Sequence, residues 1–344
     1  MAQQSAAGEL NMTIDLRSDT VTRPTLGMHR AMTEAAVGDD VFGDDPSVNR
    51  LQAFAAELVG CEAMLWFPSG TQSNLAALMS HCGRGDEYLV GQEAHTYRYE
   101  GGGAAVLGSI QPQPLPNCAD GSIALSELAA AIKPDDAHFA RTRLIALENT
   151  ISGRVLAPDY VHQVLALAVR YGLKTHLDGA RVCNAAVAQG LPVSVLCAGF
   201  DSVSICLSKG LGAPAGTLLG GDREFIRRAH RCRKILGGGM RQVGSLAAAG
   251  LYALTHHVAR LADDHANAAR LSQGLAAAGF DVTACHTNMV FMRAPAGFAA
   301  YLAQQDIKVL AGEQLRLVTH LDVDEAGIER VLRAARGFQA TPRG

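Results

Sequence analysis

Helix-like and strand-like segments alternate from about residue 46 onward, and this alternation restricts the fold more than any other feature of the chain. Residues 46–59 carry apolar side chains at helical spacing, and Gly60 is suited to end that helix. Residues 63–67 then read as a strand, 71–82 as an amphipathic helix and 87–90 as a short strand. Such an alternation predicts an α/β architecture.

The middle of the chain predicts a βαβ unit. Residues 143–147 and 173–177 read as strands, and the segment between them, 158–171, is a helix with proline first and glycine after. A right-handed crossover makes these two strands parallel. A further strand over 201–207 is followed by a glycine-rich turn and by 217–219, which we expect to return antiparallel, giving a mixed, mainly parallel sheet.

The last third of the chain changes character after a long helical region around residues 245–276. New strand-like segments appear at 289–292 and 314–319, and a terminal helix begins at Asp324. We therefore expect a small C-terminal α+β domain beside a large domain. The expected divisions are a disordered tail over 1–12, a large domain over 13–264 with an N-terminal arm over 13–45, and a small domain over 265–344.

Composition favours a small-molecule partner. The chain has 344 residues, 48% of them hydrophobic, which is enough to bury a large core. The net charge is −3 and the two signs are interspersed, so we expect no nucleic-acid partner. No apolar run approaches the roughly 18 residues that cross a bilayer, and the N-terminus resembles no secretory signal. The eight cysteines are scattered without a CxxC pair, which is typical of buried, reduced thiols in a cytoplasmic protein.

Polar residues follow three of the predicted strands, and ligands of open α/β sheets gather beyond the carboxyl ends of strands. The first group is Ser69-Gly70-Thr71, between a strand and a helix. Its backbone N–H groups and the helix dipole could bind a phosphate, although a simple Ser/Thr helix cap is the alternative.

Lys209 and Asp178 follow two other strands. Lys209 comes after an apolar strand, where desolvation favours the neutral amine that forms Schiff bases; a lysine extending into solvent is the alternative. A Ser-Lys dyad lacks its spacing, because Cys206 stands three residues before Lys209. Asp178 could keep a pyridine nitrogen protonated, or it could cap the next helix and pair with Arg181.

Metal and dinucleotide sites are not indicated. His256, His257 and His265, with Asp263 and Asp264, are interpreted as an exposed helical face, and no HExxH motif is present. The two Gly-Gly-Gly runs lack the spacing of dinucleotide binders and are interpreted as turns or close backbone approaches.

Together these segments resemble the low-specificity L-threonine aldolases, which are pyridoxal 5′-phosphate (PLP) enzymes of fold type I, the aspartate aminotransferase-like fold. The resemblance runs from about residue 13 to about 335. The matching segments are Asp15-Leu-Arg-Ser-Asp-Thr-Val-Thr22, Gly38-Asp-Asp-Val-Phe-Gly-Asp-Asp-Pro46, Ser69-Gly-Thr71, His138-Phe-Ala-Arg-Thr142, Asp178-Gly-Ala-Arg181, Leu207-Ser-Lys-Gly210, Gly237-Gly-Gly-Met-Arg-Gln242 and Arg316-Leu-Val-Thr-His320.

The resemblance implies a role for each matched residue. Lys209 would hold the cofactor as a Schiff base, Asp178 would pair with its pyridine nitrogen and His95 would stack on its ring. The phosphate would be bound by Ser69, Gly70, Thr71 and Ser208, with Arg241 reaching it from a neighbouring subunit. The substrate carboxylate would be held by Ser18, Arg181 and Arg316, and His138 or His95 would remove the β-hydroxyl proton. The chain departs from the family pattern at Phe42, often Tyr, and at Ile151-Ser152, often His-Asn.

The implied reaction is the retro-aldol cleavage of L-threonine or L-allo-threonine to glycine and acetaldehyde by a homo-oligomer, a dimer of dimers. The nearest alternatives are β-elimination and the cleavage of other β-hydroxy amino acids such as β-phenylserine. A non-catalytic PLP-binding regulator is a further alternative, but no basic recognition helix is evident.

Overall fold

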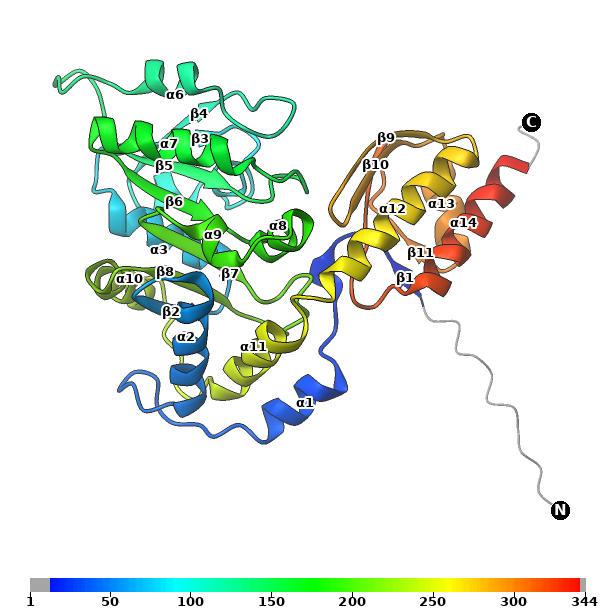
Figure 1. The fold of residues 1–344 in the computed structure, drawn as a ribbon, viewed down its shortest axis with the longest axis horizontal. Coiled ribbons are helices and arrows are strands. Elements are labelled where there is room, and N and C mark those ends of the chain that lie inside the picture. The colour runs from blue at the N-terminus through cyan, green and yellow to red at the C-terminus, as the bar shows by residue number, and fades with distance from the viewer. Residues whose placement is uncertain (1–12, 341–344) are drawn as a thin grey trace. The chain divides into compact units, whose positions relative to one another are not determined.

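A computed structural model describes residues 13–340, and the tail expected over 1–12 lies outside the described residues (Figure 1). The chain divides into two compact units. One is the continuous stretch Thr22–Asp263, called the large unit here. The other, called the C-terminal unit, joins the residues up to Val21 with those from Asp264 onward.

The large unit contains a seven-stranded sheet in the order β2-β8-β7-β6-β5-β3-β4 (Figure 1). β8 pairs antiparallel with both β2 and β7, and the other pairs are parallel. This confirms the parallel βαβ unit and the antiparallel return. The strands are β2 (Ala63–Phe67), β3 (Asp86–Gly91), β4 (Gln111–Leu115), β5 (Arg141–Glu148), β6 (Lys174–Asp178), β7 (Ser202–Cys206) and β8 (Thr217–Gly221).

Helices cover both faces of this sheet (Figure 1). Those of the large unit are α1 (Leu26–Thr33), α2 (Pro46–Val59), α3 (Gly70–His81), α4 (His95–Arg98), α5 (Gly103–Val106), α6 (Leu125–Ala131), α7 (Pro158–Tyr171), α8 (Val182–Gln189), α9 (Val193–Cys197), α10 (Arg223–Ile235) and α11 (Gly244–His256).

The ends of α2 show why the sequence predicted its limits. The Asp45 carboxylate accepts hydrogen bonds from the backbone N–H of Ser47 and Val48, both at 3.1 Å, and Pro46 occupies the first turn. Gly60 ends the helix at φ 78°, a left-handed conformation that glycine adopts without steric cost. The predicted helix over 46–59 is therefore confirmed, together with the signals that delimit it.

Side chains of β2 and β5 alternate between two apolar layers. Trp66 of β2 and Ile145 of β5 join the main core with α2 and α7, whereas Phe67 and Leu144 pack on the opposite face, which α3 covers. Burial on both faces is expected of a mainly parallel sheet.

On β6 and β7 the side chains that face α3 are polar. Leu177, Val203 and Ile205 join the main core, but the intervening side chains are polar and bond to α3. This contact between α3 and the two strands is called the polar seam. It consists of Ser73, Asn74 and His81 of α3 with His176, Asp178, Ser202 and Ser204 of the strands.

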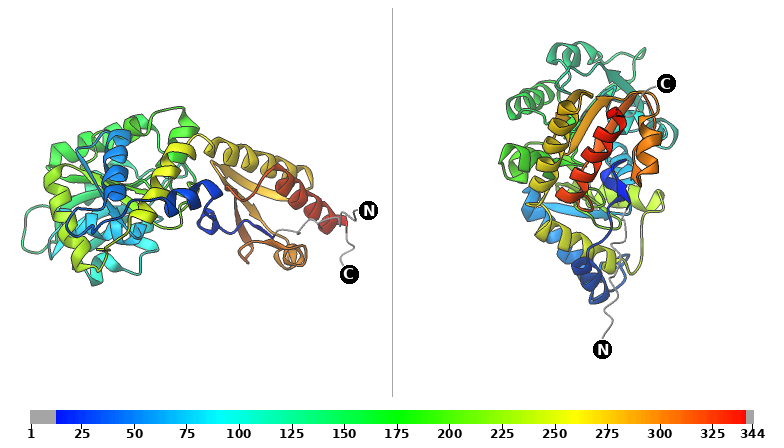
Figure 2. Two further views of the ribbon diagram at one scale, coloured as in Figure 1. Left: turned by 90° about the horizontal axis from the view of Figure 1, so that it is seen from below. Right: turned by 90° about the vertical axis from the view of Figure 1, so that its right-hand side faces the viewer.

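The C-terminal unit contains an antiparallel sheet in the order β12-β10-β9 and a separate parallel pair, β1-β11. Helices α12 and α14 lie side by side in both views of Figures 1 and 2, and Leu332 of α14 packs closely on Gly274 of α12. The elements are β1 (Ile14–Asp15), a 3₁₀ turn (Asp19–Val21), α12 (Leu261–Ala277), β9 (Asp281–His286), β10 (Met289–Arg293), α13 (Phe298–Gln304), β11 (Ile307–Lys308), β12 (Gln314–Val318) and α14 (Glu325–Ala340).

The structure corrects the expected course of the N-terminal arm. The sequence analysis placed residues 13–45 with the large domain, but residues 13–21 group with the C-terminal unit. The physical reason is the pairing of Ile14 with Ile307 in β1-β11, together with the packing of Leu16 in the C-terminal core.

The interpretation of His256, His257 and Asp264 as one exposed helical face is wrong. α11 ends at His256, and His257 is buried with its Nδ1 2.8 Å from the carbonyl oxygen of Leu211. Asp264, in the next helix, is buried as well.

Five cysteines are buried as expected, Cys61 is partly buried, and Cys118 and Cys285 are exposed. Among the described residues, no helix is long and apolar enough to span a membrane.

We predict that Asp40 is important for the stability of the large unit. Its Oδ2 lies 2.9 Å from Nη2 of Arg233, both side chains are almost fully buried, and Arg233 also donates to the carbonyl oxygen of Trp66. Asp40→Ala leaves the guanidinium buried without its charge partner, and we expect a loss of about 3–5 kcal/mol of unfolding free energy in urea.

The matched control is Glu224→Ala, which breaks solvent-exposed ion pairs with Arg227 and Arg228. Equal urea midpoints for the two variants would show that the buried pair does not stabilise this unit.

Candidate active site

Asp178 and Lys209 come from neighbouring parallel strands at the same edge of the large sheet. Asp178 is the last residue of β6 and pairs with Ser204 of β7, and Lys209 follows the end of β7 by three residues. Lys209 is half-buried, and its carbonyl oxygen accepts a hydrogen bond of 2.9 Å from the Thr22 hydroxyl. Its positive charge acts on the pKa values of His95 and Glu148, so the amine lies within electrostatic reach of both.

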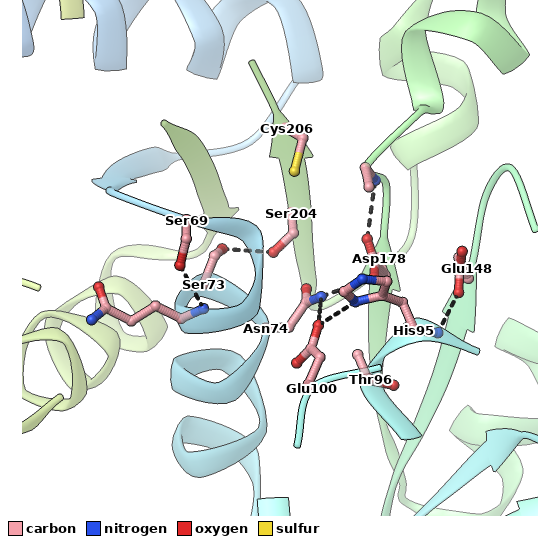
Figure 3. A network of polar contacts seen from close by, with 12 residues as sticks. Ser69, Ser73, Asn74, His95, Thr96, Glu100, Glu148, Asp178, Ser204 and Cys206 are labelled. Carbon is pink, nitrogen blue, oxygen red and sulfur yellow. Dashed lines mark hydrogen bonds and ion pairs between the residues drawn. The ribbon is translucent and has the colours of Figure 1, made fainter. Parts of the chain in front are cut away.

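The Asp178 carboxylate is 3% exposed and is held by two donors. Its Oδ2 accepts a 2.8 Å hydrogen bond from the Asn74 side-chain amide, and its Oδ1 accepts one of 3.0 Å from the Ala180 backbone N–H (Figure 3). The N-cap of the next helix, α8, is Arg181 and not Asp178, so the alternative of a simple helix cap is not supported.

His95 lies beside this carboxylate at the start of α4 (Figure 3). Its Nδ1 is 2.8 Å from Oε1 of Glu100, and its backbone N–H donates to Oε2 of Glu148 at 2.7 Å. The hydrogen bond to Glu100 raises the pKa of His95, and the nearby charge of Asp178 acts in the same direction. Burial raises the pKa of Glu100. The ring is therefore held through Nδ1, which leaves Nε2 for other contacts.

The helix α3 begins at the expected phosphate-binding segment. Ser69 caps it, with its Oγ accepting a 3.3 Å hydrogen bond from the Gln72 N–H. Ser69 is thus a helix cap, as the alternative interpretation expected. The cap does not bond the N–H groups of Gly70 and Thr71, which have no intrahelical acceptors because they lie in the first turn. A Cβ at Gly70 would lie 2.9 Å from Sγ of Cys206, so glycine is required here by the close approach of β7.

Ser208 stands next to Lys209 in the chain and is half-buried. Three groups expected around one cofactor are thus associated with the same strand ends: the first turn of α3, Asp178, and the Ser208-Lys209 pair.

Two expected residues lie on the surface of the large unit. The His138 side chain is 88% exposed, and its Nδ1 is 2.6 Å from Oδ1 of Asp136. The Arg241 side chain is 76% exposed, 3.6 Å from Asp39. The structure therefore does not bring His138 or Arg241 into the cluster around Asp178.

The expected carboxylate-binding residues are divided between the units. Ser18 and Arg316 belong to the C-terminal unit, where Nη2 of Arg316 donates to the carbonyl oxygen of Arg17 at 3.3 Å, next to Ser18. Arg181 belongs to the large unit, three residues after Asp178.

His95, Glu100 and Asp178 also resemble a metal-ligand set, because one potential ligand atom from each lies within 4.8 Å of the others. However, the Asn74 amide already donates to both carboxylates, and His95 Nδ1 is bonded to Glu100. We therefore interpret the cluster as a hydrogen-bonded network.

The two departures from the family pattern lie on different kinds of surface. Phe42 is 78% exposed in the loop before α2, whereas Ile151 is buried and forms a β-bridge with Arg154. Neither Phe42 nor Ile151 takes part in the hydrogen bonds that hold the Asp178 carboxylate.

Sequence reasoning missed Asn74, Glu100, Glu148 and His176. A usable signal existed for His176, because the twofold period of a strand places it on the same face as Asp178. Glu148 could have been found in the same way as Asp178, since it ends the neighbouring strand and pairs with it. Asn74 and Glu100 reach the site through the tertiary packing of α3 and α4, which no local pattern reveals.

The family model and the most similar sequence relatives point to one family. The sequence model of the beta-eliminating lyase family matches residues 15–295. The chain is 53% identical over 331 residues to the low specificity L-threonine aldolase of Escherichia coli strain K12, covering 95% of this chain and 99% of that protein. It is 42% identical over 337 residues to low-specificity L-threonine aldolase 1 of Arabidopsis thaliana, covering 93% and 94%.

Among solved structures, a threonine aldolase from Leishmania major superposes with a TM-score of 0.84 at 20% identity. The match covers 95% of this chain and 100% of that one. Because the match covers nearly the whole chain, it supports the fold of each of the two units.

We predict a pH-dependent cost of burying Glu148. Burial and the charge of Asp178 raise its pKa from 4.5 to about 7. The folded protein therefore holds the Glu148 proton more tightly than the unfolded chain, and this contribution to stability is present below pH 4.5 and lost as pH rises to 7. Glu148→Gln should remove this dependence, which amounts to about 2–3 kcal/mol between pH 5 and pH 8.

The measurement is urea unfolding of the cofactor-free protein at both pH values. Glu57→Gln, on an exposed position of α2, is the control and should retain the pH dependence of the unmodified protein. The same slope for Glu148→Gln and Glu57→Gln would contradict the assignment.

Proposed function

The chain belongs to the beta-eliminating lyase family and is a PLP-dependent lyase of fold type I, and we propose that it cleaves L-threonine and L-allo-threonine to glycine and acetaldehyde. The relatives that match nearly its full length are low-specificity L-threonine aldolases. The observation that carries the proposal is the placement of Lys209 and Asp178 on adjacent strand ends, next to His95.

The residues present fit this cofactor. A buried carboxylate that accepts from neutral donors suits the protonated nitrogen of a pyridine ring. The first turn of α3, with Ser69, Gly70 and Thr71, suits a phosphate, since it offers N–H groups and the positive end of a helix dipole. Ser208 adds a hydroxyl beside Lys209, whose amine would attach the cofactor.

Bound PLP supplies a ring that stabilises negative charge at the substrate Cα. Asp178 would hold a proton on the ring nitrogen, and His95 would stack on the ring. Arg181 would bind the substrate carboxylate through the planar fork that suits this group, and the resemblance implies the same ligand for Ser18 and Arg316. The position of the bound carboxylate would determine which bond at Cα is broken. Retro-aldol cleavage requires that this bond be Cα–Cβ.

We assign the removal of the β-hydroxyl proton to His95. Glu100 holds its Nδ1 and leaves Nε2 to accept the proton, whereas His138 contacts Asp136 on the surface. The raised pKa of His95 strengthens it as a base but lowers the fraction of its base form at neutral pH. Activity should therefore increase as pH rises through this pKa.

A second function, β-elimination from serine-like substrates, is suggested by the description of the matching family. It differs from retro-aldol cleavage in its products, ammonia and a keto acid. Cleavage of β-phenylserine would be a broader form of the proposed reaction.

We also propose a cytoplasmic homo-oligomer, a dimer of dimers. Exposed Arg241 and Phe42 support the assembly, because one carries the cationic group expected for a neighbouring subunit's phosphate and the other is a large apolar side chain at the surface.

We predict that Lys209→Ala abolishes acetaldehyde and glycine formation from L-threonine, because the cofactor loses its attachment. The assay follows both products after incubation of the PLP-loaded protein. Lys174→Ala, which removes an exposed lysine paired with Asp201, is the control and should remain active. Ammonia and a keto acid from the unmodified protein, in place of acetaldehyde, would refute the proposed reaction.

The choice of base is tested by a second pair of variants. His95→Phe should lower kcat by roughly 10²–10⁴-fold, the usual contribution of a general base, and should abolish the rise of activity with pH. His138→Phe should change kcat less than tenfold and keep the pH profile. The reverse pattern would assign the proton transfer to His138.

A further inference from the structure

The side chain of Asn74 joins the two carboxylates of the site. Asn74 is 2% exposed on α3, one turn into the helix. Its Nδ2 lies 2.8 Å from Oδ2 of Asp178 and 2.9 Å from Oε1 of Glu100, so each amide hydrogen serves one carboxylate (Figure 3). One neutral amide thus contacts both the expected partner of the pyridine nitrogen and the group that orients His95.

The orientation of this amide is fixed by His176, which contacts its oxygen on the side away from the two carboxylates. Ionised carboxylates only accept hydrogen bonds, so the NH₂ group of Asn74 must face them and its Oδ1 must face the sheet. There Oδ1 lies 3.2 Å from Nε2 of His176, which is fully buried on β6. His176 must therefore carry its proton on Nε2 to donate to Asn74.

His176 is in turn held in this tautomer. Burial lowers its pKa to about 4, so the ring is neutral near pH 7 and its Nδ1 is an acceptor. Nδ1 lies 2.8 Å from Oγ of Ser202, which donates to it and itself accepts from Nε2 of His81 at 2.7 Å. Every donor in the order His81, Ser202, His176 and Asn74 then points toward Asp178 and Glu100.

We propose that Asn74 is a positioning residue that fixes Asp178 for the pyridine nitrogen of the cofactor, and that His176 holds Asn74 in the required orientation. This rests on the proposed function, because it assumes that PLP binds at Asp178. Neither residue touches the substrate in this account. Both act through the carboxylate.

The chemistry of the donors supports this role over general structural support. A lysine or arginine at position 74 would also satisfy the carboxylates, but its positive charge would compete with the pyridine nitrogen for Asp178. The Asn74 amide donates one N–H to each carboxylate without adding a charge, and the neutral His176 donates to the amide oxygen and not to a carboxylate. The carboxylate is thereby held in place while it remains the counter-charge for the cofactor.

The test uses the nearly isosteric Asn74→Leu variant, which removes both donors. Apoprotein is titrated with PLP, and we expect binding at least about tenfold weaker than for the unmodified protein, the effect of losing a hydrogen bond to a charged group. Asn267→Leu is the control. It removes an amide that donates to the Val323 carbonyl oxygen in the C-terminal unit, and PLP binding should remain within about twofold.

A second readout separates positioning from structural support. The visible absorbance of the bound cofactor is titrated with pH in both proteins. Weaker support of Asp178 leaves less positive charge on the ring, so the nitrogen that joins Lys209 to the cofactor should protonate more readily. We expect the pH midpoint of this protonation, read from the absorbance, to lie at least about half a pH unit higher in Asn74→Leu than in the unmodified protein. An unchanged midpoint with unchanged PLP binding would overturn the proposal.

His176 supplies a rescue series that stays informative if Asn74→Leu does not fold. His176→Gln keeps an N–H near the position of Nε2, whereas His176→Leu removes it. We expect PLP binding and the absorbance midpoint to stay near those of the unmodified protein in the first variant and to shift as in Asn74→Leu in the second. Equal behaviour of the two variants would contradict the role of His176.

These outcomes are separable from failure of the proposed function. If the unmodified protein binds no PLP, or binds it without cleaving threonine, the proposed function fails. If the unmodified protein does both and the variants match it in binding and absorbance, only the positioning roles of Asn74 and His176 fail.

Discussion

The hydrogen bonds that hold the Asp178 carboxylate at the end of β6 are the constraint on which the site depends. An ionised carboxylate at 3% exposure costs several kcal/mol unless donors compensate it. The large unit provides the Asn74 amide and the Ala180 N–H, and then orients Asn74 through His176 and Ser202. The polar seam is therefore a consequence of placing one charge where the sheet is otherwise apolar.

One helix connects the two ends of the expected cofactor site. The first turn of α3 offers N–H groups for a phosphate, and Asn74 lies one turn further along, about 6 Å by the rise of an α-helix. The same helix packs on β6, which ends at Asp178, and on β7, which precedes Lys209. The glycine at position 70 allows this packing, because a Cβ there would collide with Cys206.

Much of this could be predicted from the sequence, and the limits have physical causes. Caps and breakers such as Asp45, Gly60 and Gly172 fix helix ends locally, so those elements were predictable. Asp178 and Lys209 were found because strand ends of parallel sheets meet at one edge. The pairing of β1 with β11, and the contacts of Asn74 and Glu100, join residues far apart in the chain or depend on packing angles, and no local pattern encodes them.

We infer that Lys209, alone among the five lysines, carries PLP. The most direct measurement is reduction of the PLP-loaded protein with borohydride, followed by proteolysis and mass spectrometry of the lysine-containing peptides. We expect a stable pyridoxyl adduct on Lys209 and on none of the other four lysines. An adduct on Lys133, Lys174, Lys234 or Lys308 in place of Lys209, or no adduct at all, would contradict this inference.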